Sequence, residues 1–215
     1  MLKSESVDLI LPMKKFILLI YSAWVSSAFA TVLVPMKESK VFLSVPYTMG
    51  THELEGQGFL GSAHLDESTL QMSEGRFSLA VDRITGEKKT LVCHMKEALT
   101  LDYEKADFPE EHICEDDKLP SEGKNAPVYP EIEVQQLKPI SIDGTSMTVR
   151  WTIHGVSREQ VIPVSIRWDK LSRNLTVRSN FSIDRKEYDI TVKKFLFIGV
   201  DEKIPLKIQL VLGEK

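Results

Sequence analysis

The stretch WTIHGVSREQVIPVSI, residues 151–166, decides the fold. Apolar and polar side chains alternate on both sides of His154 and Gly155, and a period of two is typical of β-strands with one buried face. Gly155 supplies the backbone freedom that a tight turn needs. The stretch therefore predicts a β-hairpin, in which HGVSRE connects one strand to the next.

A catalytic alternative for the same stretch would have His154 activate Ser157. A serine three residues away in a tight turn does not establish the geometry of such a pair, and no acidic orienting partner is identifiable. By strand parity His154 lies on the outward face with Thr152 and Arg150. We therefore expect a turn here and no catalytic residue.

The same alternation recurs along most of the chain. It is seen in KVFLSVPY (40–47), GQGFLGSAHL (56–65), GRFSLAVDRI (75–84), residues 131–137, MTVRWTIH (147–154), VIPVSIRW (161–168), NLTVRSNFSI (174–183) and PLKIQLVL (205–212). About eight antiparallel strands of this kind hide their apolar faces either by pairing two sheets or by closing into a barrel. The strand count alone does not choose between the two.

One segment breaks the period of two. Residues 88–103 space Leu91, Met95, Ala98 and Leu99 at helical intervals, which predicts a single helix. The charged segment that follows, rich in proline and glycine, is typical of a long loop. The sequence thus predicts an all-β domain with one inserted helix.

Length and charge bound the class of protein. The chain has 215 residues, 42% of them hydrophobic, which suits one domain with a substantial core, expected over residues 31–215. The formal net charge of -4 gives no broad positive field of the kind that nucleic-acid backbones require. We expect no nucleic-acid partner.

The N-terminal 30 residues have the layout of a secretory signal. MKKFILLIYSAWVSSAFA, from Met13, combines two lysines, an apolar run shorter than the ~20 residues that span a bilayer, and small residues at Ala28 and Ala30. We expect cleavage after Ala30 and, because a start at Met13 gives an ordinary signal peptide, translation from Met13. The alternative is an uncleaved membrane anchor. The lysines and the Ala-x-Ala site suit a bacterium, and hence the periplasm.

Export sets the redox environment of Cys93 and Cys114. In an oxidising compartment two cysteines in one helix-and-loop excursion are expected to pair, which would stabilise the fold by ~3 kcal/mol. The alternative is two separate thiols. A metal site is less favoured, because Cys93, His94, His112 and Cys114 lack a paired Cys-x-x-Cys spacing.

Four segments together resemble the YceI-like family of exported bacterial proteins. WTIHGVSREQVIPVSI resembles its strand-turn-strand signature, and three others resemble family elements in the same order: GQGFLGSAHLD, YPEIEV and SNFSIDRKEYDI. The similarity spans residues 40–212. The sequence departs from the family at GEKKTLVCHMKEAL, which replaces its usual acidic and arginine residues, and in a longer loop that contains Cys114.

The resemblance implies a lipocalin-like antiparallel β-barrel that holds a long-chain amphiphile, typified by polyisoprenoids or related lipids. We therefore expect a binding protein and not an enzyme. A pocket for such a chain needs a row of apolar side chains that point into the barrel. Strand parity indicates which residues these are. The expected ligand-binding residues are Leu43, Val45, Phe59, Phe77, Leu79, Val81, Ile132, Val134, Val149, Trp151, Ile153, Val164, Ile166 and Phe181.

Three hypotheses for the function follow. The leading one is a periplasmic carrier or store of such a lipid, with no other cofactor and no metal; transient membrane contact and a homodimer are compatible with it. A second is a structural or stress-protective domain whose barrel is filled by its own side chains. A third, less favoured, is a lipid-modifying enzyme with His64, His94 or His154 as base.

Overall fold

The computed structural model of the chain describes residues 30–106, 114, 118–192 and 199–215. The predicted signal peptide, with Ala28, lies outside these residues; Ala30 is the first residue described. The strands in this part of the chain are β1 (Thr31–Pro35), β2 (Lys40–Tyr47), β3 (Gly50–Gln57), β4 (Leu60–Asp66), β5 (Gln71–Ala80), β6 (Ile84–Gly86), β7 (Glu131–Gln136), β8 (Ile140–Ser141), β9 (Ser146–Ile153), β10 (Val156–Pro163), β11 (Ser165–Asp169), β12 (Asn174–Asp184) and β13 (Lys203–Glu214). The helices are α1 (Lys89–Thr100) and the 3-10 helices η1 (Val81–Arg83) and η2 (Arg185–Tyr188).

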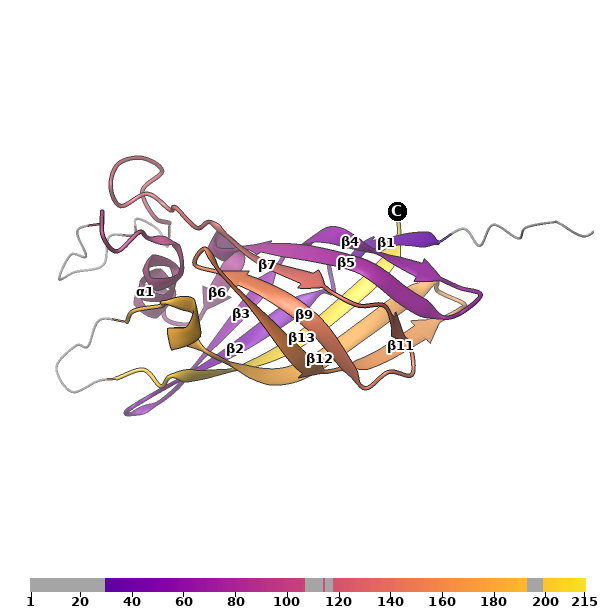
Figure 1. Cartoon of the computed structure of the whole chain (residues 1–215). Helices are drawn as coiled ribbons and strands as arrows, with labels where there is room; N and C mark the ends of the chain where they lie inside the picture. Colours follow the sequence, from indigo (N-terminus) through magenta and orange to yellow (C-terminus); the bar gives the residue numbers. More distant parts are fainter. Residues whose placement is uncertain (1–29, 107–113, 115–117, 193–198) are drawn as a thin grey trace, which may run out of the picture.

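All strands belong to one antiparallel sheet, which curls into a barrel (Figure 1). Hydrogen-bonded neighbours follow the order β10-β9-β7-β5-β4-β1-β13-β2-β3-β6, while β12 pairs with β13 and β11 with β12. The sheet is not closed, since no ladder joins β10 to β12 in the described strands. Ser179 Oγ donates to Pro163 O across this seam, at 2.6 Å. The prediction of an antiparallel barrel with one helix is confirmed.

Breaks within three of the eight or so predicted strands divide them into eleven, and β1 and β8 are two further strands that the sequence did not predict. Residues 36–39 separate β1 from β2, residues 58–59 separate β3 from β4, and η1 separates β5 from β6. The segment predicted as one strand over 161–168 breaks at Val164, after which the chain changes partner: β10 pairs with β9, and β11 with β12. Pro163 has no N–H to donate to a ladder, which suits the end of a strand.

The predicted hairpin is formed by β9 and β10. Ile153 pairs with Val156, so the turn holds only His154 and Gly155, fewer residues than the predicted HGVSRE connection. Both turn residues have positive φ, 51° and 74°, as a type I′ turn requires. A Cβ on Gly155 would lie 2.5 Å from Cε1 of Tyr129, so space as well as backbone conformation requires glycine here.

Helix α1 lies at one end of the barrel, beside β6 (Figure 1). It is shorter than the predicted helix over 88–103, because Leu101 is extended, with ψ 145°. Ala98 and Leu99 are buried as their spacing predicted, but Lys96 is buried as well, whereas Leu91 and Met95 are only partly so. The burial of Lys96 depends on a tertiary contact: its Nζ donates to the backbone carbonyl of Asp82 in η1, at 3.1 Å.

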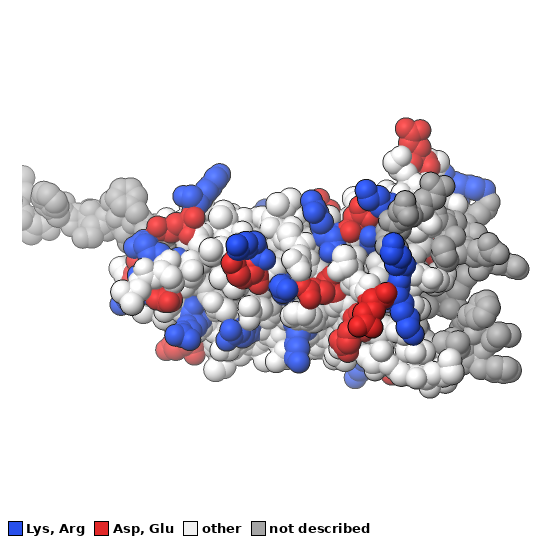
Figure 2. All heavy atoms as spheres, turned by 180° about the vertical axis from the view of Figure 1, so that it is seen from behind, with Lys and Arg blue, Asp and Glu red and all other residues white. Residues whose placement is uncertain are grey.

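The surface carries charges of both signs. Figure 2 shows Lys and Arg side chains interspersed with Asp and Glu over the face that it displays. No helix in the described ranges is long and apolar enough to span a membrane. On the displayed face, the described residues form no broad patch of one sign.

Candidate functional site

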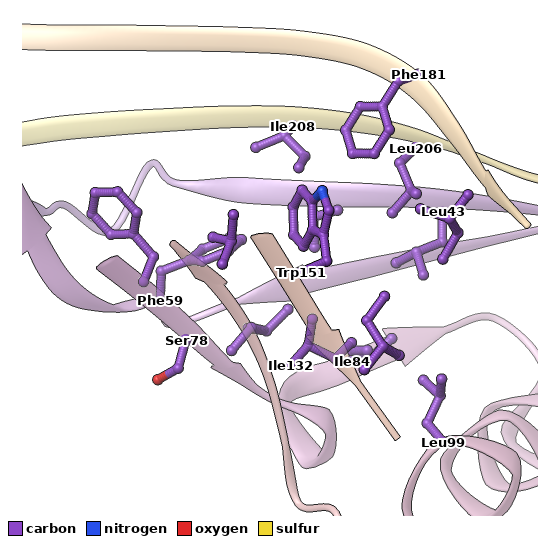
Figure 3. Close-up of a pocket in the computed structure, with 16 residues that line it drawn as sticks. Leu43, Phe59, Ser78, Ile84, Leu99, Ile132, Trp151, Phe181, Leu206 and Ile208 are labelled. Carbon is purple, nitrogen blue, oxygen red and sulfur yellow. The ribbon is translucent and has the colours of Figure 1, made fainter. Parts of the chain in front are cut away.

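An apolar cavity of about 60 Å³ lies inside the barrel, near the end that α1 occupies (Figure 3). Most of its wall comes from the inner face of the sheet, and Leu99 contributes from α1. The lining residues are Val41, Leu43, Phe59, Phe77, Ser78, Leu79, Ile84, Leu99, Ile132, Val134, Trp151, Ile153, Phe181, Ile183, Leu206 and Ile208. The alternation of the strands turns these apolar side chains toward one another.

A second cavity of about 60 Å³ adjoins the first. The two share Phe59, Phe77, Val134, Trp151 and Ile208, so movement of these side chains would join them. The other residues that line the second cavity are Met72, Gly75, Gln136, Met147, Val149, Ile162, Val164, Val177, Ser179 and Leu210. The interior therefore holds two small adjoining apolar cavities rather than one open pocket.

No charged side chain among the described residues lines either cavity. The Ser78 hydroxyl points away from the labelled side chains around the first cavity (Figure 3). Gln136 Nε2 donates to two backbone carbonyls at 2.9 and 2.8 Å, and its Oε1 accepts from Gly75 N at 3.2 Å. Ser179 is likewise paired, across the seam. An ion without a partner would pay a large desolvation cost inside such a wall. The interior suits uncharged, apolar groups.

The structure places eleven of the fourteen predicted ligand-binding residues on these cavities. The first cavity is lined by Leu43, Phe59, Phe77, Leu79, Ile132, Val134, Trp151, Ile153 and Phe181, and the second adds Val149 and Val164. Val45, Val81 and Ile166 line neither. Val81 is buried in η1, where strand parity is lost, and Ile166 lies beyond the break at Val164. Contact with a ligand stays a prediction for all fourteen.

Other lining residues were missed from the sequence. Val41, Leu206 and Ile208 share faces with residues of the recognised alternating segments, so strand parity could have included them. Leu99 and Ile84 could not be found in this way, because their place depends on how α1 and β6 pack at the end of the barrel.

A disulfide between Cys93 and Cys114 ties α1 to the segment that follows it, the pair expected from the sequence. The Cα atoms lie 5.9 Å apart. The Glu97 carboxylate approaches this pair, with Oε1 at 3.5 Å from Cys93 Sγ. With both sulfurs in the disulfide, neither is a thiolate that could ligate a metal.

His154 anchors the segment after α1. Its Nε2 lies 2.8 Å from Leu101 O, so this nitrogen carries the proton and donates to the carbonyl. The ring stacks on Tyr103 and meets Tyr129 edge-on, each at a centroid distance of 4.6 Å. The predicted turn is confirmed and His154 lies away from the interior, but its side chain is not open to solvent, because the residues after α1 fold over the ring and leave the residue 8% exposed.

Tyr103 extends this anchor. Burial raises the pKa of Tyr103 to about 12, despite an opposing hydrogen bond from Thr191. The neutral hydroxyl donates to Ala98 O in the last turn of α1 and accepts from Thr191 N at 3.3 Å. Tyr103 therefore links the end of the helix to the segment after η2.

The histidines considered as catalytic bases do not line the cavities. His64, His94 and His154 are absent from both walls. Ser157 Oγ lies 2.9 Å from Thr152 Oγ1, in a cross-strand pair, and is not partnered with His154 among the described contacts. None of these three histidines is therefore placed as a base beside the apolar interior.

Solved structures of several proteins share the fold. BcnA of Burkholderia cenocepacia superposes with a TM-score of 0.59 at 14% identity, covering 83% of this chain and 98% of that one. A polyisoprenoid binding domain from Saccharophagus degradans gives 0.53 at 10%, covering 86% and 99%. The YCEI protein of Campylobacter jejuni gives 0.53 at 16%, covering 78% and 88%. At these identities the likeness shows the fold alone.

Sequence comparison supplies the family. No curated protein matches the chain. The family model described as the YceI-like domain matches residues 33–212, a range that includes every strand from β2 to β12 and both cavities. The extent of this match, together with the barrel and its apolar interior, leads to one conclusion: the chain belongs to the YceI-like domain family.

Proposed function

We propose that this chain is a periplasmic binding protein that holds a long-chain amphiphile of the polyisoprenoid type in its barrel, as a carrier or a store. The uncharged, apolar cavity between the sheet and Leu99 carries this proposal. Burial of apolar surface contributes ~25 cal/mol per Å², so an alkyl or isoprenoid chain gains most from such a wall. The family supports it, since one solved structure of this fold is described as a polyisoprenoid binding domain.

The distribution of charge around the cavities indicates which part of the amphiphile would enter the barrel. Neither cavity has a charged wall, so the chain would lie inside and a charged head group would stay at the mouth, in contact with water. Taking the amphiphile from a membrane or delivering it to one would involve transient membrane contact. A homodimer stays a prediction.

The cavity volume sets a condition on this function. Each cavity measures about 60 Å³, whereas small-molecule sites usually measure ~300–1,000 Å³. A long chain therefore requires the shared side chains, Phe59, Phe77 and Trp151 among them, to move and join the two spaces. The same small volume favours a second candidate, a structural or stress-protective domain whose barrel is filled by its own side chains.

A binding titration with paired variants separates the two candidates. Parinaric acid, a long-chain amphiphile that fluoresces in apolar surroundings, would be titrated into the wild-type protein, Val134→Trp and Val161→Trp. Val134 lines both cavities, whereas Val161 is 63% exposed on β10, so the same substitution fills the interior in one case only.

The carrier hypothesis predicts that Val134→Trp weakens binding at least tenfold and that Val161→Trp leaves it unchanged. Circular dichroism and urea unfolding check that each variant keeps its β-structure. If Val134→Trp does not fold, Ile208→Phe, a milder change at a residue shared by both cavities, replaces it. Equal binding by the wild type and a folded filled variant, or no binding by the wild type, would favour the packed domain.

A further inference from the structure

Trp151 presents the one buried side-chain nitrogen or oxygen atom of the described cavity walls that lacks a hydrogen-bond partner. Four buried side-chain nitrogen or oxygen atoms in the described residues lack a hydrogen-bond partner, and they belong to Asn125, Trp151, His154 and Trp168. Only Trp151 among them lines a cavity, and it lines both. The residue is 7% exposed, so bulk water does not satisfy its indole N–H.

The indole nitrogen faces the interior. Figure 3 shows it on the edge of the ring that is turned toward Phe181 and Leu206. The rings of Trp151 and Phe181 have centroids 5.5 Å apart and planes inclined by 31°. Because the N–H lies in the plane of the indole, this small inclination keeps it from pointing down onto the face of Phe181. The aromatic ring is therefore not a substitute acceptor.

An indole N–H can only donate, so what satisfies it must bring an acceptor. A buried donor left without a partner is unfavourable, and the surrounding wall is apolar. The acceptor must also be neutral, because the described walls of the two cavities hold no cationic side chain to balance an anion. Carbonyl, ester, ether and hydroxyl oxygens meet both conditions.

We propose that Trp151 determines specificity inside the barrel, and that the ligand is an apolar chain that carries a neutral oxygen acceptor in its buried part, hydrogen-bonded to Trp151 Nε1. This inference rests on the proposed binding function and narrows it. A plain hydrocarbon chain fills the cavity but leaves the N–H unpaired, so the protein selects against it. A charged head group at the mouth is a separate feature of the ligand.

The test compares isosteric ligands in paired variants. Dodecanones with the carbonyl at carbon 2, 4 or 6 would be compared with analogues in which a methylene group replaces the carbonyl oxygen, by native mass spectrometry or calorimetry. Trp151→Phe removes the N–H and keeps an aromatic ring. Trp168→Phe is the matched control, because Trp168 Nε1 is also unpaired but lines neither cavity.

For at least one carbonyl position, the ratio of ketone to methylene affinity should fall about five- to tenfold in Trp151→Phe and stay unchanged in Trp168→Phe. The ratio cancels the loss of ring volume, which affects both ligands. A ratio that is the same in the wild type and Trp151→Phe at all positions would overturn the role of Trp151 and leave the binding function intact. No binding of either ligand to the wild type would overturn both proposals.

A spectroscopic readout locates the hydrogen bond. In protein with ¹⁵N-labelled tryptophan, the Trp151 indole proton should move downfield on addition of the ketone and less on addition of the methylene analogue, while the Trp168 indole serves as internal reference. A shift of equal size with both ligands would count against a bond to the carbonyl.

Discussion

Removal of the disulfide between Cys93 and Cys114 should lower the free energy of unfolding by about 3 kcal/mol. The two residues are 21 positions apart, and the entropy of closing a loop of that length in the unfolded chain gives this magnitude at 25 °C. We expect the α1 end of the barrel to be destabilised most, because Cys93 lies on α1. The first cavity would be affected too, since Leu99 of the same helix lines it.

Urea unfolding of the wild type and of the Cys93→Ala/Cys114→Ala variant measures this difference. Cys93 is buried, so the double substitution also removes some packing. Wild-type protein unfolded and refolded in reductant separates the two effects, because it lacks the bond but keeps both sulfur atoms. If both the variant and the reduced protein lose less than ~1 kcal/mol, the reasoning from the entropy of the unfolded chain is refuted.

Three further predictions concern the anchor around the β9–β10 turn. His154→Asn keeps a residue that tolerates positive φ but loses the donor to Leu101 O and both ring contacts, and should cost ~1–3 kcal/mol in urea unfolding; an unchanged midpoint would show that these contacts contribute nothing. Gly155→Ala should destabilise by at least ~1–2 kcal/mol, because φ is 74° and the new Cβ would meet Tyr129; stability equal to wild type would contradict the turn geometry. The pKa of Tyr103 is raised to about 12 from 10.0, so its contribution to stability is complete below pH 10 and is lost as pH rises through about 12. The free energy of unfolding of Tyr103→Phe should fall less steeply than that of the wild type between pH 10 and about 12. Parallel pH profiles of the two proteins would show that Tyr103 does not cause the pH dependence.

Strand parity predicted the fold well where strands are long and half-buried. β9 and β12 lie within a residue of their predicted bounds, because each alternates without interruption. β1 and the first part of β3 were missed, since THELEG has little apolar alternation and β1 follows directly on the predicted signal peptide. The break at Val164 was also missed, because alternation continues through it while the pairing partner changes.

The candidate site was predictable only as far as parity reaches. Parity names which side chains face inward, and Phe59, Phe77 and Trp151 do line the cavities. It does not say which inward residues leave space between them, which depends on side-chain packing across the barrel. It also gave no sign that Trp151 Nε1 would be unpaired or that His154 would be buried, since both follow from contacts with segments far away in the sequence.

The central claim, that the barrel holds a long-chain amphiphile, is tested most directly by native mass spectrometry of protein purified without detergent from the periplasm of its own host. The expected result is a chain that begins at Thr31 with one long-chain molecule bound, released on denaturation and identified after organic extraction. A bare mass, with no adduct even after incubation with polyisoprenoid lipids, would contradict the claim and favour the packed barrel.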